Sequence, residues 1–218
     1  MTTPARRPFS IDDLRARARN RLSLSLPDHA LDPSVAPSRG DYALNPPGPG
    51  PEIVAQAKPA AVLAPIVARP GGPTILLTLR AAKMRSHSGQ VAFPGGKIDA
   101  GEGPQAAALR EAHEEIGLEA RHIEPLGWLD PYLTGTGFRI MPLVALLHPG
   151  FALKINTHEV EEVFETPLSF LMDPANHQRH EREWQGRMRQ FYAMPHEGRY
   201  IWGATAGILR NLYERLYR

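Results

Sequence analysis

The stretch that decides the fold is residues 95–118, which read GGKIDAGEGPQAAALREAHEEIGL. Its second half carries the signals of a helix, since Pro104 suits a first helical position and Gly117 suits a left-handed C-terminal stop. Apolar residues that recur at the 3.6-residue period predict one face packed on a core. These residues are Leu109, Ala112 and Ile116.

Three carboxylates are spaced i, i+3, i+4 on nearly the opposite side of this helix, at Glu111, Glu114 and Glu115. In a bare helix they repel one another by a few tenths of a kcal/mol per pair, and the C-terminal end of the helix dipole disfavours them further. A hard divalent cation reverses both effects, because Mg²⁺ or Mn²⁺ prefers carboxylate and phosphate oxygens. A solvated acidic face is the alternative explanation.

The flanking residues make this stretch resemble a Nudix box, whose pattern is G-x5-E-x7-R-E-U-x-E-E-x-G-U with U apolar. Every spacing is kept, and the matching residues are Gly96, Glu102, Arg110, Glu111, Ala112, Glu114, Glu115, Gly117 and Leu118. The resemblance implies hydrolysis of a diphosphate linked to another group, with Mg²⁺ or Mn²⁺ as cofactor. It also implies a metal site made by Gly96 and the three helix glutamates, and a supporting pair between Glu102 and Arg110.

A second motif lies immediately upstream, where the chain reads LLTLRAAKMRSHSGQVAFPGG. It resembles the pattern LLTxR[SA]x3Rx3Gx3FPGG of the Nudix subgroup that hydrolyses coenzyme A. The resemblance implies coenzyme A or an acyl-coenzyme A as substrate. The matching residues are Leu76, Leu77, Thr78, Arg80, Ala81, Arg85, Gly89, Phe93, Pro94, Gly95 and Gly96.

The second motif supplies candidate substrate-binding residues. Arg80 and Arg85 suit a phosphate-rich ligand, because a guanidinium makes permanently charged, bidentate contacts to phosphate. Ser88 is a candidate hydrogen-bond donor. Phe93 belongs to the same motif and is included with them, although its turn also suits a packing role. Without the motif, both arginines would be interpreted as mostly structural surface residues.

A general base is expected from an acidic loop after the box, where Nudix proteins often place a further carboxylate. The segment EVEEVFETP contains Glu159 and Glu162, which are the two candidates for a catalytic role beside the helix glutamates. A solvated face is the alternative for each. The sequence His177-Gln178-Arg179-His180 is interpreted as a loop, since no second pair stands at zinc spacing.

Composition limits the remaining possibilities. The chain has 218 residues, a net charge of +2 and no cysteine. No apolar run approaches the roughly 20 residues that span a membrane, and so small a charge gives no argument for nucleic acid. The absence of cysteine excludes disulfides and suits a reducing compartment. We therefore expect a cytoplasmic protein, a possible homodimer, with neither a nucleic acid nor a membrane as partner.

The predicted elements divide the chain into two parts. Residues 1–56 form a leading helix that begins at Ser10, followed by a proline-rich arm that we interpret as irregular rather than packed. Two acidic residues near the start argue against reading this segment as a transit peptide. Residues 57–218 contain strands near 60–67, 75–80, 123–129 and 138–147, a hairpin around 195–198 and a final helix at 205–217.

The resemblance implies an α/β fold of the Nudix type, an α/β/α sandwich with a mixed β-sheet between helices. The most concrete hypothesis is hydrolysis of the coenzyme A pyrophosphate into 3′,5′-ADP and (acyl-)4′-phosphopantetheine. One alternative is a Nudix hydrolase of another substrate, such as ADP-ribose, a dinucleotide or a capped RNA. Another is a non-catalytic nucleotide sensor, which has no need to tolerate the repulsion among the three glutamates.

Overall fold

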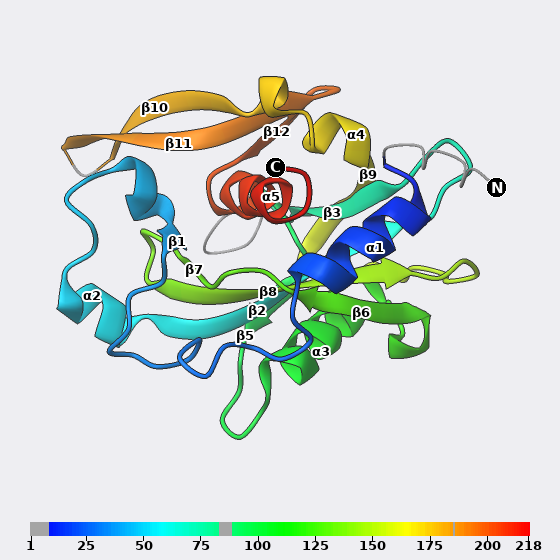
Figure 1. The fold of residues 1–218 in the computed structure, drawn as a ribbon, viewed down its shortest axis with the longest axis horizontal. Coiled ribbons are helices and arrows are strands. Elements are labelled where there is room, and N and C mark those ends of the chain that lie inside the picture. Colours follow the sequence, from blue (N-terminus) through cyan, green and yellow to red (C-terminus); the bar gives the residue numbers. More distant parts are fainter. Residues whose placement is uncertain (1–8, 83–88, 185) are drawn as a thin grey trace.

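A mixed nine-stranded sheet forms the centre of the molecule (Figure 1). The computed structural model describes residues 9–82, 89–184 and 186–218. Strands β2 and β8 run parallel side by side along their full lengths, and most other pairs are antiparallel. The strands of this sheet are β1 (Arg39–Gly40), β2 (Lys58–Val67), β3 (Thr74–Arg80), β4 (Val91–Ala92), β5 (Gly95–Lys97), β6 (Ile123–Trp128), β7 (Tyr132–Leu133), β8 (Phe138–Leu147) and β9 (Val160–Pro167).

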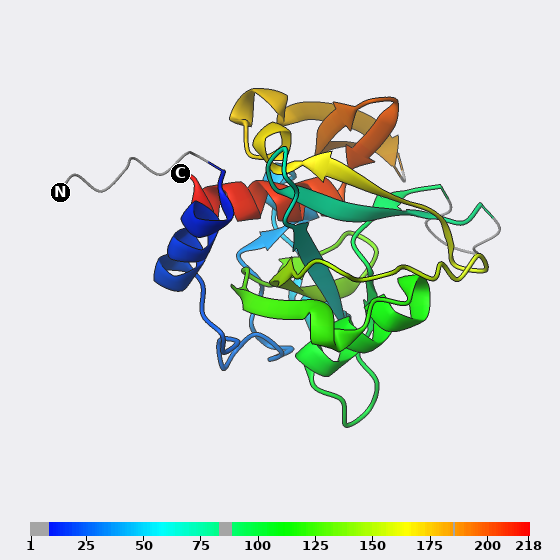
Figure 2. The ribbon, with the colours of Figure 1, turned by 90° about the vertical axis from the view of Figure 1, so that its right-hand side faces the viewer.

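Helices cover both faces of the sheet (Figure 2). Side chains on a strand alternate between faces, so that Leu76 packs with α3 (Pro104–Ile116) while Leu77 packs with α5 (Ala204–Leu216). Strand β2 alternates in the same way. The result is the predicted α/β/α sandwich with a hydrophobic core on each side of the sheet. No helix in the described part of the chain is long and apolar enough to cross a membrane.

Helix α3 forms where the sequence predicts it. Pro104 is its first residue, and Gly117 ends it in the left-handed region at φ +69°. The Gly117 N–H donates to the carbonyls of Ala112 and His113, which satisfies backbone groups that the helix end leaves open. The side chain of Glu115 is buried, so the alternative of a solvated acidic face does not account for this carboxylate.

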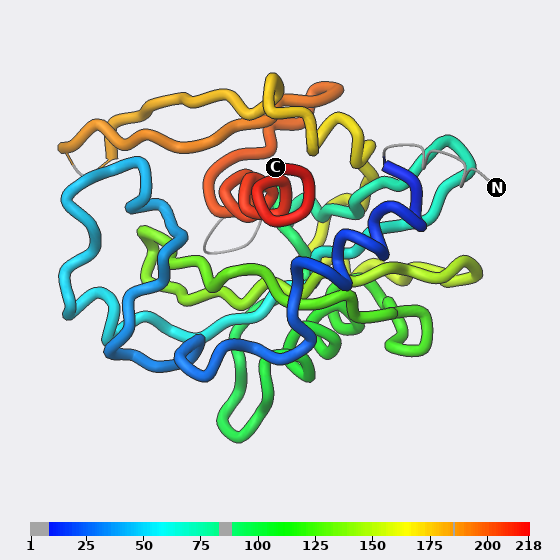
Figure 3. The backbone as a smooth tube through the Cα atoms, viewed as in Figure 1, coloured from blue at the N-terminus to red at the C-terminus, as the bar shows by residue number. Residues whose placement is uncertain are grey.

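The N-terminal helix α1 (Ile11–Arg21) is also confirmed, with the Ser10 hydroxyl accepting the Asp13 N–H at 3.1 Å. The proline-rich arm that follows is more ordered than predicted (Figure 3). It contains β1, a 3₁₀ turn η1 (Asp41–Leu44) and the short helix α2 (Pro51–Gln56). Asp41 accepts hydrogen bonds from the Tyr132 hydroxyl at 2.7 Å and the Gly135 N–H at 2.6 Å. These tertiary contacts make the arm a packed part of the body.

A second, three-stranded antiparallel sheet lies across α5, made of β10 (Gln178–Trp184), β11 (Arg187–His196) and β12 (Arg199–Trp202). The predicted hairpin around residues 195–198 is confirmed as the β11–β12 connection. The predicted loop at His177–His180 is wrong, because residues 178–180 are the first part of β10. Polar and charged residues occupy both faces of β10, so the apolar alternation that identifies a strand is missing there. A four-residue helix, α4 (Leu168–Leu171), leads into this sheet.

Candidate active site

The two sequence motifs meet at an ion pair between Arg80 and Glu115. Arg80 is the last residue of β3, and its Nη1 donates to Glu115 Oε1 at 3.4 Å. The Gly95 N–H donates to the other carboxylate oxygen at 3.1 Å. Glu115 is only 2% exposed. The fold therefore holds this carboxylate between the upstream motif and the box helix.

The environment of Glu115 disfavours the charged form of its carboxyl. Burial is the largest cause that raises the pKa of this carboxyl to about 7, and the nearby charges of Glu111 and Glu159 raise it further. The Gly95 N–H and the Arg80 guanidinium oppose the shift without cancelling it. Burial also raises the pKa of Glu111, with contributions from Glu114 and Glu159. These interactions bring four carboxylates into one electrostatic neighbourhood.

Arg110 holds the loop before the helix against the helix itself. Its Nε and Nη2 each donate to the Glu102 carboxylate at 2.9 Å, and Nη2 also donates to the Lys97 carbonyl at 3.1 Å. The hydrogen bond from Arg110 is the main cause that lowers the pKa of Glu102. This bidentate geometry agrees with the supporting role predicted for the pair.

Gly96 gives the Glu111 carboxylate room to lie against the backbone. A Cβ at position 96 would collide with the carboxylate carbon and both oxygens of Glu111. Gly96 pairs with Ala61 of β2 through the short strand β5, which fixes the backbone at this point. The glycine thus allows a close approach between the box loop and the helix.

The donor set of this site fits a hard divalent cation. Among the described residues no three acidic or imidazole groups stand as a ready-made metal cluster. Arg110 Nη1 instead binds Glu111 at 2.9 Å and Glu114 at 3.0 Å, while Glu115 binds Arg80 and Gly95. The groups that could bind a metal here offer oxygen atoms, which Mg²⁺ and Mn²⁺ prefer. The pKa values of the Glu111 and Glu115 carboxyls are raised, and a bound cation would lower them.

The structure separates the two candidate bases. Glu159 raises the pKa of both Glu111 and Glu115, so its carboxylate belongs to the same neighbourhood. Asn156 orients it by donating from Nδ2 to Glu159 Oε1 at 3.1 Å. Glu162, by contrast, is bound by the Arg199 guanidinium of β12. Sequence analysis missed Asn156, although Asn is a typical turn residue, and here its Oδ1 accepts the His158 N–H two residues further on at 3.2 Å.

The remaining predicted residues fall in two groups. Phe93 is 3% exposed and packs in the core on the α5 side, which argues against contact between its ring and substrate. Its burial instead anchors the turn before β5. Arg85 and Ser88 lie outside the described residues. Their proposed contacts with substrate stay predictions.

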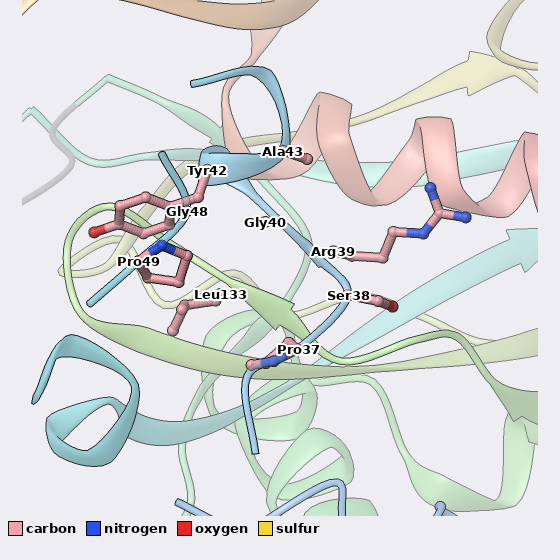
Figure 4. A pocket seen from close by; sticks show the side chains of 9 residues that line it. All are labelled: Pro37, Ser38, Arg39, Gly40, Tyr42, Ala43, Gly48, Pro49 and Leu133. Atoms are coloured by element: carbon pink, nitrogen blue, oxygen red, sulfur yellow. The ribbon is translucent and has the colours of Figure 1, made fainter. Parts of the chain in front are cut away.

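A cavity of about 200 Å³ lies within the proline-rich arm, closed on one side by Leu133 of β7 (Figure 4). Its lining contains no carboxylate and no imidazole, and Arg39 points away from it toward α5, where it pairs with Glu214 at 2.6 Å. The cavity therefore offers no ligands for a metal. It is lined by Pro37, Ser38, Arg39, Gly40, Tyr42, Ala43, Gly48, Pro49 and Leu133.

Comparisons with known proteins identify relatives of this chain. The NUDIX domain family matches residues 57–191. An uncharacterised Nudix hydrolase, NudL, of Photorhabdus laumondii is 38% identical over 176 residues, which cover 80% of this chain and 94% of that protein. NudL of Citrobacter koseri is 40% identical over 154 residues, or 70% of this chain and 80% of that protein.

Among solved structures, the Nudix hydrolase RenU of M. smegmatis is similar at 22% identity and a TM-score of 0.48. The similarity covers 72% of this chain and 84% of RenU. The family match covers more than half of the chain, and it includes the complete box and the strands around it. The chain belongs to the Nudix hydrolase family.

Proposed function

We propose that this Nudix hydrolase cleaves the pyrophosphate bond of coenzyme A or its thioesters, giving 3′,5′-ADP and (acyl-)4′-phosphopantetheine. The observation that carries the proposal is the pair between Arg80 and Glu115. It joins the motif typical of coenzyme A hydrolysis to the helix that carries the metal ligands. Arg80 Nε is also buried without a hydrogen-bond partner among the described residues, so one donor remains for a ligand.

Each residue has a distinct role in this proposal. The carboxylates of Glu111, Glu114 and Glu115 hold the cation, and the Gly96 backbone lies beside them. When bound, Mg²⁺ or Mn²⁺ neutralises phosphate charge and lowers the pKa of a coordinated water. Arg80 orients a substrate phosphate through its guanidinium. Glu159 accepts the proton of the attacking water, because its carboxylate is held at the glutamate cluster by Asn156.

The cellular setting follows from the substrate. Coenzyme A carries a free thiol, which stays reduced at the redox potential of the cytosol. We therefore place the reaction in the cytoplasm. The arginines account for the phosphates of the substrate, so the proposal needs no nucleic-acid or membrane partner.

A substrate panel tests the proposal directly. Purified protein is incubated with Mg²⁺ or Mn²⁺ and coenzyme A, dephospho-coenzyme A or ADP-ribose, and products are separated by chromatography. We expect 3′,5′-ADP to be released fastest from coenzyme A. Cleavage of dephospho-coenzyme A and ADP-ribose but not of coenzyme A would support the metal site and exclude coenzyme A as the substrate. If the protein binds one of these compounds but does not cleave it in the presence of Mg²⁺ or Mn²⁺, the alternative of a non-catalytic nucleotide sensor is favoured.

The role of Arg80 has a matched control in the chain. Arg80→Gln removes a guanidinium from the glutamate cluster, whereas Arg69→Gln removes one that pairs with Glu165 away from it. We expect Arg80→Gln to lower kcat/KM for coenzyme A by roughly tenfold or more, which corresponds to one charged phosphate contact. Equal activity in the two variants would contradict this role.

A further inference from the structure

One face of the β10–β12 sheet carries a cluster of aromatic rings. Cross-strand partners share a face, and the register pairs His180 with Phe191 and Ala193 with Trp202. The ring centroids of His180 and Phe191 are 6.1 Å apart, and those of Phe191 and Trp202 are 5.2 Å apart. Tyr200 completes the group at 5.8 Å from His180. Tyr200 is 41% exposed, so the cluster is open to solvent at this ring.

The opposite face of the same sheet is occupied by the protein core. Met194 and Ile201 lie on that face by register, and both are fully buried in the core that contains α5. Figure 1 shows the sheet lying over α5. The aromatic side chains therefore do not complete the hydrophobic core, and a ligand is free to approach them.

The charges of the β10–β11 hairpin are sorted between the two faces. By register, Arg182 lies opposite Arg189 on the aromatic face, whereas Glu181 and Glu183 point to the other face. Like charges directly opposite one another destabilise a sheet. Arg187 adds a third cation next to them, opposite Trp184. An anionic ligand would remove this repulsion.

The arginines of the aromatic face also lack acidic partners. Among the described residues no carboxylate lies within ion-pair distance of Arg182, Arg187 or Arg189. Residues 1–8, 83–88 and 185 contain no Asp or Glu. Arg189 Nε is buried with no hydrogen-bond partner among the described residues. The face thus combines exposed π surface with cations that have no acidic partner among the described residues, of which Arg189 lies over the Tyr42 ring at 5.9 Å.

This face is connected to the candidate active site through β12. Arg199, which precedes Tyr200, binds Glu162, and Glu162 pairs in register with Leu79, the residue before Arg80. On the other side of Tyr200, the chain continues to Thr205, whose hydroxyl donates to the Val91 carbonyl of β4 at 2.9 Å. The strand that carries Tyr200 therefore lies next to the end of β3, where Arg80 meets Glu115.

We propose that this face, defined by His180, Phe191, Tyr200, Trp202 and the three arginines, binds the purine nucleotide end of the substrate. The base stacks on the exposed Tyr200 ring, and Arg182 and Arg189 contact a phosphate on the ribose. An aromatic ring can stack on any nucleobase, because every base has a π face. A guanidinium matches the geometry of a phosphate group. The assignment rests on the proposed function, since it names where the nucleotide of that substrate lies.

Binding of adenosine 3′,5′-bisphosphate, without metal, tests the face separately from catalysis. Quenching of the fluorescence of Trp184 and Trp202 reports occupancy of this face, and equilibrium dialysis gives the Kd. We expect Tyr200→Ala and Arg182→Gln each to raise the Kd about tenfold, as for loss of one stacked base or one charged contact. Tyr200→Phe keeps the ring and should retain wild-type binding.

Arg179→Gln is the matched control, because it removes the same charge from the same strand on the opposite face. Its Kd should equal that of the wild-type protein. An unchanged Kd in both Tyr200→Ala and Arg182→Gln would overturn the proposal. So would an equal loss in Arg179→Gln and Arg182→Gln, since bulk charge would then explain the binding.

Kinetics with coenzyme A separates this proposal from the proposed function. We expect the KM to rise about tenfold in Tyr200→Ala and Arg182→Gln while kcat is unchanged, because the nucleotide end contributes equally to ground and transition states. Cleavage of coenzyme A with an unaltered KM would support the function and overturn the binding face. The wild-type protein could also fail to cleave coenzyme A while Tyr200→Ala and Arg182→Gln selectively lose bisphosphate binding. That outcome would support the binding face and overturn the proposed substrate.

Discussion

At the scale of single residues, burial decides what each carboxylate of this protein can do. Glu115 is almost fully buried and its pKa is raised to about 7, mainly by that burial. Glu102 faces the Arg110 guanidinium, whose hydrogen bond lowers the pKa of the carboxyl. The two residues belong to the same motif and have the same side chain. Their different surroundings suit Glu115 for a cation and Glu102 for a permanent ion pair.

The two candidate bases give the first prediction. Glu159→Gln should lower kcat for the hydrolysed substrate by about 10² or more, because it removes a proton acceptor held at the glutamate cluster. Glu162→Gln should retain most of kcat, since its carboxylate is bound by Arg199 instead. Steady-state kinetics on both variants provides the measurement. A larger loss in Glu162→Gln would reverse the assignment.

A buried histidine gives a prediction on pH dependence. His177 Nε2 lies 2.7 Å from the Leu171 carbonyl, and Nδ1 lies 3.3 Å from Arg210 Nη1. Because the guanidinium can only donate, His177 is neutral, with its proton on Nε2. Burial is the main cause that lowers its pKa, and Arg210 lowers it further. As the pH falls below about 6.5, the His177 imidazole binds a proton in the unfolded chain but not yet in the folded chain.

The free energy of unfolding should therefore decrease as the pH falls from about 6.5 toward the lowered pKa of the folded state. The contribution of His177 approaches about 1.4 kcal/mol per pH unit at most. Urea titrations between pH 5 and 7.5 measure it as the difference in slope between wild type and His177→Gln. Identical slopes in the two proteins would show that this imidazole titrates equally in the folded and unfolded states.

At the scale of elements, helix α3 is held in place by its ends as much as by its apolar face. Ala112 and Ile116 pack on the sheet, while Gly117 turns the chain sharply at a positive φ. The chain returns close to this turn, since the Lys154 N–H donates to the Ile116 carbonyl at 2.8 Å. The loop that carries Asn156 and Glu159 is thus hydrogen-bonded to the end of the helix, where the Asn156 N–H also donates to the Glu115 carbonyl at 2.9 Å.

Substitution of Gly117 tests this connection. Gly117→Ala places a Cβ in the left-handed region and 2.9 Å from the Lys154 backbone nitrogen. We expect a loss of about 2–3 kcal/mol in the free energy of unfolding, from backbone strain plus the collision. Gly101→Ala is the control, because Gly101 has φ +82° with nothing within 4 Å of the new Cβ. Equal losses in urea titrations of the two variants would show that the collision contributes nothing.

At the scale of the whole molecule, the proline-rich arm joins parts that are distant in the sequence. Asp41 holds the β7–β8 turn, Asn45 exchanges two hydrogen bonds with the backbone of Gln190 on β11, and Arg39 pairs with Glu214 on α5. Figure 3 shows the arm running along one side of the body between these elements. The arm therefore supports the position of the β10–β12 sheet.

Removal of the Asp41 carboxylate tests this support. Asp41→Ala leaves the Tyr132 hydroxyl and the Gly135 N–H without their acceptor, at a cost of about 1–3 kcal/mol for each buried group. We expect faster limited proteolysis in residues 26–57 and a lower urea midpoint. Asp32→Ala is the control, since Asp32 bonds only locally to Ser34 on the surface. Equal proteolysis of both variants would contradict the bridging role.

The sequence by itself determined the family, the box helix with both of its ends, and four strands of the nine-stranded central sheet, β2, β3, β6 and β8. These features depend on local signals, such as the proline and glycine at the helix ends and the apolar runs of β2, β3 and β8. Local signals act over a few residues, so the spacing along the chain is enough to recognise them.

Only the tertiary structure decided the burial of Glu115, the different surroundings of Glu159 and Glu162, the packing of the arm and the strand β10. Each depends on a partner far away in the sequence, such as Arg80 for Glu115 and Arg199 for Glu162. Strand β10 has charged residues on both faces, and its pairing with β11 is what makes it a strand. Neighbouring residues do not specify such contacts, because the folded chain selects them through global packing and desolvation.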